Sequence, residues 1–297
     1  MGKEYRNNQI IFEGEYFNDK RWNGKGKEYS NYYNKLVYEG EYLNGNKHGN
    51  VKEYDIDKGV LILEGNYLNG EKNGKFKEYD KDKGILILEG NYLNGKRHGK
   101  FKEYNKINGK LIFEGEYLND EKNGFIKEYD EYGKPLFEGE YLNGKKNGKG
   151  KEYNWYNNLI FEGEYLNDKR WNGKGKEYNR NDKWIYEGGY LNGKRNGKAK
   201  VYYDNGDILF DGEYKNGKYD GKGEEYFKRE KIKYKGNFLD GKYNGTGEEY
   251  YPNGNVRYSG EYLKGKYNGK GKEYLKSGKL FREGEYLKGK LIKKQNE

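Results

Sequence analysis

The chain has 297 residues, of which only 32% are hydrophobic and 36% are charged, and it carries a net charge of +10 at pH 7. This composition excludes an ordinary thick core and, taken alone, is typical of a disordered chain. The aromatic content of 18%, with 36 tyrosines, opposes disorder, because disordered chains are poor in aromatic residues. The 47 glycines and 2 prolines instead favour many short strands joined by tight turns.

Several protein classes are disfavoured by what the sequence lacks. There is no cysteine, so we expect neither a disulfide framework nor a thiolate metal site. No apolar run approaches the roughly 18 residues that a membrane-spanning helix needs. The first residues lack the apolar segment of a signal peptide. We therefore expect a cytoplasmic protein, at a membrane surface or within a larger assembly.

A short phrase centred on glycine, typified by Phe113-Glu114-Gly115-Glu116-Tyr117, recurs along the whole chain. A fixed period of 24 to 26 residues indicates a repeat architecture. We predict eleven full repeats and a truncated twelfth in one continuous array over residues 1–297, with 285–297 as the truncated last repeat and tail. The central glycine of each phrase, here called the marker glycine, is Gly14, Gly40, Gly65, Gly90, Gly115, Gly139, Gly163, Gly188, Gly212, Gly236, Gly260 or Gly284.

Each repeat is predicted to begin with a strand that contains the marker glycine. A large apolar or aromatic residue lies two positions before the marker and an aromatic residue two positions after it, as in Phe137 and Tyr141 around Gly139. This spacing places all three residues on one face of a strand. Because glycine in mid-strand lowers stability unless a neighbour needs the space, we expect an aromatic ring to lie over the bare backbone.

The rest of each repeat indicates a hairpin. The phrase Asn-Gly-Lys-x-Asn-Gly, as at 143–148, is predicted to be a connection of several residues, followed by a returning strand and a second polar turn. The predicted fold is all-β, an elongated single-layer antiparallel meander of about 11–12 tandem β-hairpin repeats. One point stays open: Tyr29 differs in parity from Gly24 and Gly26, which requires either a bulge near Lys25 or aromatic residues on both faces.

The repeat resembles the MORN family, whose unit is aromatic-x-Gly-x-aromatic, a glycine turn and Gly-x-Gly. Residues 38–42 and 147–150 match this pattern. Phrases such as Tyr203-Asp204-Asn205-Gly206 look like variant MORN repeats. The resemblance implies an elongated β scaffold in membrane-associated or cytoskeletal assemblies, with terminal repeats that dimerise in some members. The chain departs from the pattern where the second glycine of Gly-x-Gly is replaced, by Val51, Phe76, Phe101, Ile126 and Ala199.

Catalytic chemistry is not indicated. The two histidines, His48 and His98, each precede a turn glycine in separate repeats and are interpreted as turn residues. Carboxylates recur with the repeat, so no single acid–base pair stands out. We predict no catalytic residue, metal, cofactor or small-molecule substrate, and hence no enzyme.

Paired cations are the first candidate binding feature, because regular stacking of the hairpins would align them as a basic stripe along one edge. The stripe has three interpretations: a solvated face that keeps the sheet soluble, a contact with anionic lipid, and a contact with nucleic acid, which is the least favoured. The residues that would bind an anionic partner are Lys20, Arg21, Lys96, Arg97, Lys145, Lys146, Lys169, Arg170, Lys194 and Arg195.

Three tyrosines near the C-terminus, Tyr219, Tyr243 and Tyr267, occupy corresponding positions and should align at intervals of roughly 10 Å. Exposed tyrosine favours interfaces, so one hypothesis is a protein-contact stripe. The alternative is a separate lineage of duplicated repeats.

The sequence thus predicts a non-catalytic repeat scaffold that mediates protein–protein interaction or assembly. The alternative function is a module that binds phospholipid through basic hairpin turns. The sheet ends near 3–12 and 285–292 would be open, so self-association through terminal repeats is also expected.

Overall fold

The computed structural model describes residues 1–294, and all regular structure in that range is β-strand. Contacts divide the chain into two compact units, Met1–Asn158 and a second that begins at Leu159. The first unit contains β1 (Gly2–Arg6), β2 (Gln9–Phe17), β3 (Lys20–Tyr29), β4 (Leu36–Leu43), β5 (Asn46–Tyr54), β6 (Leu61–Leu68), β7 (Glu71–Tyr79), β8 (Leu86–Leu93), β9 (Lys96–Tyr104), β10 (Leu111–Leu118), β11 (Glu121–Tyr129), β12 (Pro135–Leu142) and β13 (Lys145–Tyr153).

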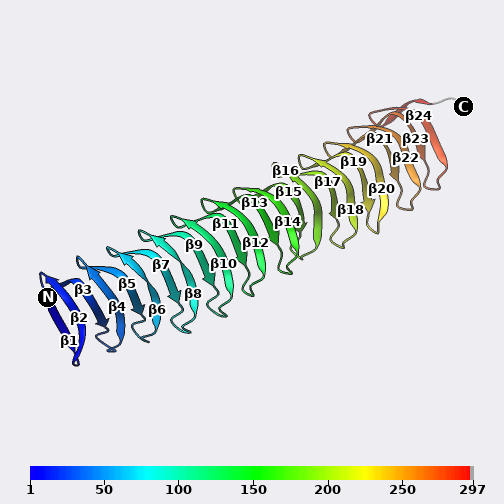
Figure 1. The fold of residues 1–297 in the computed structure, drawn as a ribbon. Helices are drawn as coiled ribbons and strands as arrows, with labels where there is room; N and C mark the ends of the chain where they lie inside the picture. The colour runs from blue at the N-terminus through cyan, green and yellow to red at the C-terminus, as the bar shows by residue number, and fades with distance from the viewer. Residues whose placement is uncertain (295–297) are drawn as a thin grey trace. The chain divides into compact units, whose positions relative to one another are not determined.

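The second unit contains β14 (Leu159–Leu166), β15 (Lys169–Tyr178), β16 (Trp184–Leu191), β17 (Lys194–Tyr202), β18 (Ile208–Lys215), β19 (Lys218–Phe227), β20 (Lys231–Leu239), β21 (Lys242–Tyr250), β22 (Val256–Leu263), β23 (Lys266–Tyr274), β24 (Leu280–Leu287) and β25 (Lys290–Lys294). Within each unit every strand pairs antiparallel with its neighbours in sequence, which gives a meander of hairpins (Figure 1). The predicted all-β antiparallel meander is confirmed.

The hairpin turns contain two residues, so the predicted connection of several residues is wrong. At the turn between β12 and β13, Asn143 and Gly144 both have positive φ, 49° and 76°. These values are typical of a type I′ turn, whose twist matches that of the flanking strands. The second Asn-Gly, at Asn147-Gly148, lies inside β13 as a bulge, where Gly148 has φ 107° and the register shifts between Gly139 and Tyr141.

The buried core lies on one face of the sheet, here called the core face. It consists mainly of residues two positions before and after the marker glycines, together with the residues that replace the second glycine of Gly-x-Gly, such as Val51 and Phe76. Tyr258 is fully buried, and its hydroxyl donates a hydrogen bond of 3.0 Å to the backbone oxygen of Glu261. Its ring therefore crosses Gly260, where an added Cβ would lie 2.8 Å from the Tyr258 hydroxyl and 2.6 Å from the Cα of Gly271. The predicted reason for the marker glycine is confirmed.

Residue size is complementary across several hairpins, which explains two of the departures from Gly-x-Gly, Phe76 and Phe101. Gly271 pairs with the marker Gly260 and leaves room for the tyrosine ring of Tyr258. In the third repeat, whose marker is Gly65, the buried residue is a smaller leucine, Leu63, and Phe76 stands opposite the marker instead. The ring that covers the glycine backbone thus comes from whichever of the two strands carries it.

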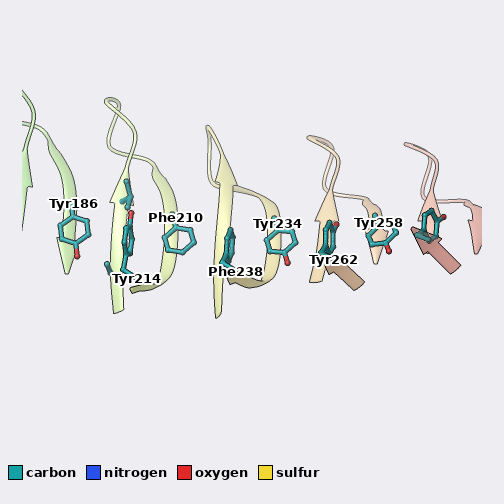
Figure 2. Close-up of a cluster of buried hydrophobic side chains, with 10 residues drawn as sticks. Tyr186, Phe210, Tyr214, Tyr234, Phe238, Tyr258 and Tyr262 are labelled. Atoms are coloured by element: carbon teal, nitrogen blue, oxygen red, sulfur yellow. The ribbon is translucent and has the colours of Figure 1, made fainter. Parts of the chain in front are cut away.

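Neighbouring repeats are joined through these rings. In the second unit, Phe210 contacts Phe238 edge-on at 5.3 Å between ring centroids, and Tyr234 contacts Tyr262 at 5.4 Å. Figure 2 shows these rings projecting from one side of successive hairpins. Edge-to-face pairs at such distances stabilise by about 0.5–1.5 kcal/mol beyond their buried area.

Aromatic residues also lie on the opposite face, here called the groove face, which carries the residues on either side of each marker, most of them glutamates. There the Tyr79 hydroxyl donates to Glu64 at 2.8 Å and that of Tyr104 to Glu89 at 2.8 Å. Burial and the hydrogen bond to Glu64 raise the pKa of Tyr79 to about 12. The open question of parity is therefore answered by aromatic residues on both faces. In the hairpin of β2 and β3 the bulge falls at Trp22, nearer the turn than Lys25.

Size complementarity makes a testable prediction for the repeat that contains Leu63 and Phe76. Phe76→Gly should lower stability by about 3–5 kcal/mol, because it empties the space over the marker glycine. Leu63→Tyr alone should overpack the site. The double variant reproduces the arrangement of Tyr258 and Gly271 and should recover more than 1 kcal/mol relative to the sum of the single changes. Hydrogen exchange in β6 and β7 measures this locally, and additive effects would contradict it.

Candidate functional site

The second residue of each returning strand covers the buried ring on the core face; we call it the lid position. In Arg195 the guanidinium carbon lies 4.1 Å from the centroid of the Tyr186 ring, and in Lys146 the ammonium lies 4.0 Å from that of Phe137. Cation–π contacts of this kind contribute about 0.5–2 kcal/mol. Eight lids are cations: Arg21, Lys47, Lys72, Arg97, Lys122, Lys146, Arg170 and Arg195.

Glutamates on the returning strands hold the cationic lids and connect one repeat to the next. Lys47 pairs with Glu53 at 2.6 Å, and Glu53 also accepts a hydrogen bond of 3.2 Å from Tyr67 of the following repeat. Arg195 donates two hydrogen bonds, of 2.9 and 2.6 Å, to the carboxylate of Glu177. Burial alone would raise the pKa of Glu177, but the hydrogen bonds from Arg195 and Tyr190 outweigh it, so the pKa lies below its ordinary value.

The predicted stripe of paired cations is divided between the two faces, which corrects the prediction that the pairs lie together. Because the turn has only two residues, each pair occupies the first two positions of a strand, and these point to opposite faces. The second member of each pair is a lid, namely Arg21, Arg97, Lys146, Arg170 or Arg195. The first member is exposed on the groove face: Lys20, Lys96, Lys145, Lys169 and Lys194. Binding of an anionic partner by these residues stays a prediction.

Tyr219, Tyr243 and Tyr267 occupy the lid position in the second unit. Their rings stack face to face on Phe210, Tyr234 and Tyr258 at centroid distances of 3.7, 3.6 and 3.7 Å. The expectation of an exposed stripe is wrong, because the rings are half-buried and replace the cationic lids. Their role in a protein interface stays a prediction.

A row of half-exposed apolar residues runs along the groove face and was missed in the sequence. Its members lie three positions after a marker glycine, beside the turn, directly after the aromatic residue of the core face. The position after Gly212 is Lys215, which interrupts the row. Across the hairpin each member pairs with the first residue of the returning strand, as Leu142 pairs with Lys145. The members of this leucine row, 39–55% exposed, are Phe17, Leu68, Leu93, Leu118, Leu142, Leu166, Leu191, Leu239, Leu263 and Leu287.

The groove face of the first unit is hollowed into a groove of about 1450 Å³ that crosses the strands from β2 to β11. Marker glycines such as Gly65 and Gly90 form part of its floor, and lysines and glutamates line its sides. Ion pairs join neighbouring hairpins there, for example Lys102 with Glu114 at 3.5 Å. A smaller hollow over Gly212, Gly223 and Gly236 lies on the same face of the second unit.

The sequence model of the MORN repeat matches the chain at residues 38–50, 89–100, 137–158, 186–208, 210–229, 234–256 and 258–279. The last four matches fall on successive hairpins, and the repeats of Gly65, Gly115 and Gly163 lie between the earlier ones. The chain is a MORN-repeat protein. MORN repeats are a non-enzymatic repeat family associated with scaffolds for protein or membrane interaction.

Other comparisons add little to the MORN assignment. No curated protein matches the chain. Among solved structures, the crystal structure of TcdB2-TccC3-Cdc42 matches at 10% identity with a TM-score of 0.19, over 91% of this chain and 18% of that one. The crystal structure of TcdB2-TccC3 matches at 11% identity with a TM-score of 0.20, over 88% of this chain and 15% of that one. The chain spans less than a fifth of either, and TM-scores this low support no inference.

The MORN repeats of residues 1–294 bring no metal-binding chemistry together. In that range no three histidine, cysteine or carboxylate side chains cluster closely enough to hold a metal ion. His48 and His98 lie in separate repeats, each with its Nδ1 atom buried and without a hydrogen-bond partner among the described residues. Nor does this range contain a helix with the length and apolar character to cross a membrane.

The ion pair of Arg195 and Glu177 predicts a pH dependence. Because the pKa of Glu177 in the folded protein lies below 4.5, its stabilisation is present above pH 4.5 and is lost as the pH falls through the lowered pKa. Arg195→Met should lower stability by about 1.5–3 kcal/mol at pH 7, and this difference should shrink below pH 4.5. Urea unfolding at several pH values measures it, with Lys194→Met as the matched control on the other face. An unchanged difference at low pH would contradict the assignment.

The tyrosine lids predict a loss of stability rather than of surface contacts alone. Replacing Tyr219, Tyr243 and Tyr267 by serine removes three stacked rings and should lower stability by about 2 kcal/mol or more per site. Replacing them by arginine, which serves as a lid elsewhere, should cost clearly less. Thermal melting followed by near-UV circular dichroism compares the two variants. Equal melting temperatures for the serine variant and the unmodified chain would reject the lid role.

Proposed function

We propose that the chain is a non-catalytic scaffold that holds an elongated protein partner along its groove face. The leucine row carries this proposal. Each of its members is substantially exposed although the core face already buries one ring per repeat under a lid. Exposed apolar residues that gather into a row within one unit, as from Leu68 to Leu142, mark interaction sites. A partner with apolar side chains at intervals of roughly 10 Å would match the row, since each repeat advances by two strands.

The polar side chains of the groove face support a binding role more than a catalytic one. Its carboxylates are engaged in ion pairs that recur from hairpin to hairpin, as in Lys77 with Glu64 at 3.9 Å and Lys200 with Asp211 at 3.5 Å. A catalytic acid or base needs an environment that distinguishes it from its neighbours. Recurrent ion pairs offer every repeat the same environment.

Anionic membrane binding is the second candidate function, and the second unit favours it. There the leucine row pairs with lysine, as Leu191 with Lys194, Leu239 with Lys242 and Leu263 with Lys266. In the hairpin of β18 and β19 both paired residues are lysine. In the first unit two of the corresponding positions are Glu71 and Glu121. Each lysine near an anionic bilayer contributes about 1 kcal/mol. For either function we propose a cytoplasmic location, within a larger assembly or at a membrane surface.

Site-specific photo-crosslinking distinguishes the candidates. A benzophenone side chain at Leu93, Leu191 or Leu263 should capture one and the same protein in the native cell. The matched control positions, Arg97, Arg195 and Tyr267, lie on the core face and should not capture it. Purified partner should then bind a variant with all three leucines changed to asparagine at least about tenfold more weakly.

Binding to vesicles of stated composition tests the second candidate. If the scaffold proposal holds, the chain should show no salt-sensitive sedimentation with phosphatidylserine vesicles beyond that with phosphatidylcholine vesicles. Salt-sensitive sedimentation that is lost in a variant with glutamine at Lys194, Lys242 and Lys266, together with crosslinks to lipid alone, would replace the scaffold by a membrane module.

A further inference from the structure

The connections between hairpins in the first unit expose a row of large apolar side chains. These connections, within residues 30–35, 55–60, 80–85, 105–110, 130–134 and 154–158, lie at the edge opposite the two-residue turns. Five of the six carry such a residue. We call this row the apolar edge; its members and their exposed fractions are Tyr32 94%, Tyr33 55%, Ile56 56%, Ile107 67%, Tyr132 61%, Trp155 69% and Tyr156 73%.

The connections that carry the apolar edge are held in place by hydrogen bonds. Within one connection, the Asp55 carboxylate accepts from the backbone nitrogens of Asp57 and Lys58 at 3.0 and 2.8 Å. Between connections, Lys83 donates to the backbone oxygen of Ile107 at 2.7 Å and Lys110 to that of Tyr132 at 2.9 Å. A surface fixed in this way loses little conformational entropy on binding.

The charges of the six connections nearly cancel, because their seven lysines stand against five aspartates and one glutamate, and Lys58 pairs with Asp82 at 2.6 Å. The edge therefore offers apolar contact and little positive charge, which disfavours an anionic surface as its partner.

The repeat pattern does not account for the apolar edge, because the same edge of the second unit differs. There Tyr203 and Tyr251 are half-buried, and their hydroxyls donate to the backbone oxygens of Tyr226 and Tyr274 at 2.7 and 3.0 Å. The connection 179–183 reads Asn-Arg-Asn-Asp-Lys and has no apolar residue. An exposed apolar row confined to one unit has no role in the fold, and rows of this size mark contacts with another molecule.

We propose that the apolar edge pairs, antiparallel, with the apolar edge of a second copy of this chain. Read along the edge, an aromatic pair comes first, an isoleucine second, and an aromatic pair last. Reversal about the centre places Tyr32 and Tyr33 against Trp155 and Tyr156 of the second copy. It also places Ile56 against Tyr132 and the connection 80–85 against 105–110. A surface that complements itself on reversal is what a two-fold symmetric dimer requires.

The area of the apolar edge is sufficient for such a dimer. An aromatic side chain buries about 150–250 Å² when fully covered. Seven large apolar side chains, each more than half exposed, therefore provide on the order of 800 Å². This matches the contribution of one partner to a standard interface. Tryptophan and tyrosine at its two ends are also the residue types enriched among those that dominate binding energy.

Sedimentation velocity of the full chain over a concentration series tests the dimer. The unmodified chain should be a reversible dimer. A variant with serine at Tyr32, Ile56, Trp155 and Tyr156 should dissociate at least about 100-fold more readily, with an unchanged circular dichroism spectrum, because these side chains are exposed. The matched control, Leu275→Ser with Leu280→Ser and Phe281→Ser, removes 44–58% exposed apolar side chains from the second unit and should leave the dimer intact.

Disulfide crosslinking tests the antiparallel arrangement, since the chain has no cysteine of its own. A mixture of Tyr32→Cys and Trp155→Cys chains should form a mixed disulfide faster than either variant forms one alone. Faster crosslinking of Tyr32→Cys with itself would overturn the arrangement. A chain that stays monomeric, or a dimer that the serine variant does not weaken, would overturn the interface. Sedimentation of a monomeric chain with phosphatidylcholine vesicles would assign the edge to a membrane instead.

Discussion

An aromatic ring laid across the bare backbone of glycine is the contact on which most repeats depend, and over Gly115 the isoleucine Ile126 takes the place of the ring. A single-layer sheet has no second layer to cover its apolar face, so each ring must be buried by its own sheet and by neighbouring side chains. The marker glycine lets the ring approach the backbone, as Tyr258 does over Gly260. The lid position then covers the other side of the ring, and together they bury it completely.

This geometry explains why residues as different as lysine, arginine and tyrosine serve as lids. Each combines a flat or extended apolar body with a polar tip. The body covers the ring, and the tip reaches a glutamate: Arg195 reaches Glu177 and Tyr243 reaches Glu225 at 2.5 Å. Where tyrosine replaces a cationic lid, the hydrogen-bond partners available to the neighbouring buried hydroxyls change. The Tyr262 hydroxyl is left buried without a partner among the described residues, whereas Phe238 fills the corresponding position without a hydroxyl.

The period of the sequence predicted the strands, the meander and the reason for the marker glycine, because these follow from parity and from the size of one residue. The length of the hairpin turn could not be predicted from the period. Asn143-Gly144 and Asn147-Gly148 are identical in sequence, yet the first is the turn and the second a bulge. That choice depends on how strand twist pairs the two strands, which no single dipeptide reveals. A connection of several residues would place the paired cations in the turn. The two-residue turn instead places them at the start of a strand, where they point to opposite faces.

The apolar edge could not be predicted from the period of the sequence. Tyr32, Ile107 and Trp155 lie outside the repeated phrase and at unequal positions in their connections, so no period draws attention to them. Yet residues of this kind are the ones that the core leaves unconstrained. Positions that bury rings must be nearly the same in every repeat, and they can carry only a function that the whole array shares. We therefore propose that partner choice resides in the leucine row with its paired charges and in the connections, where one unit can differ from the other without disturbing the core.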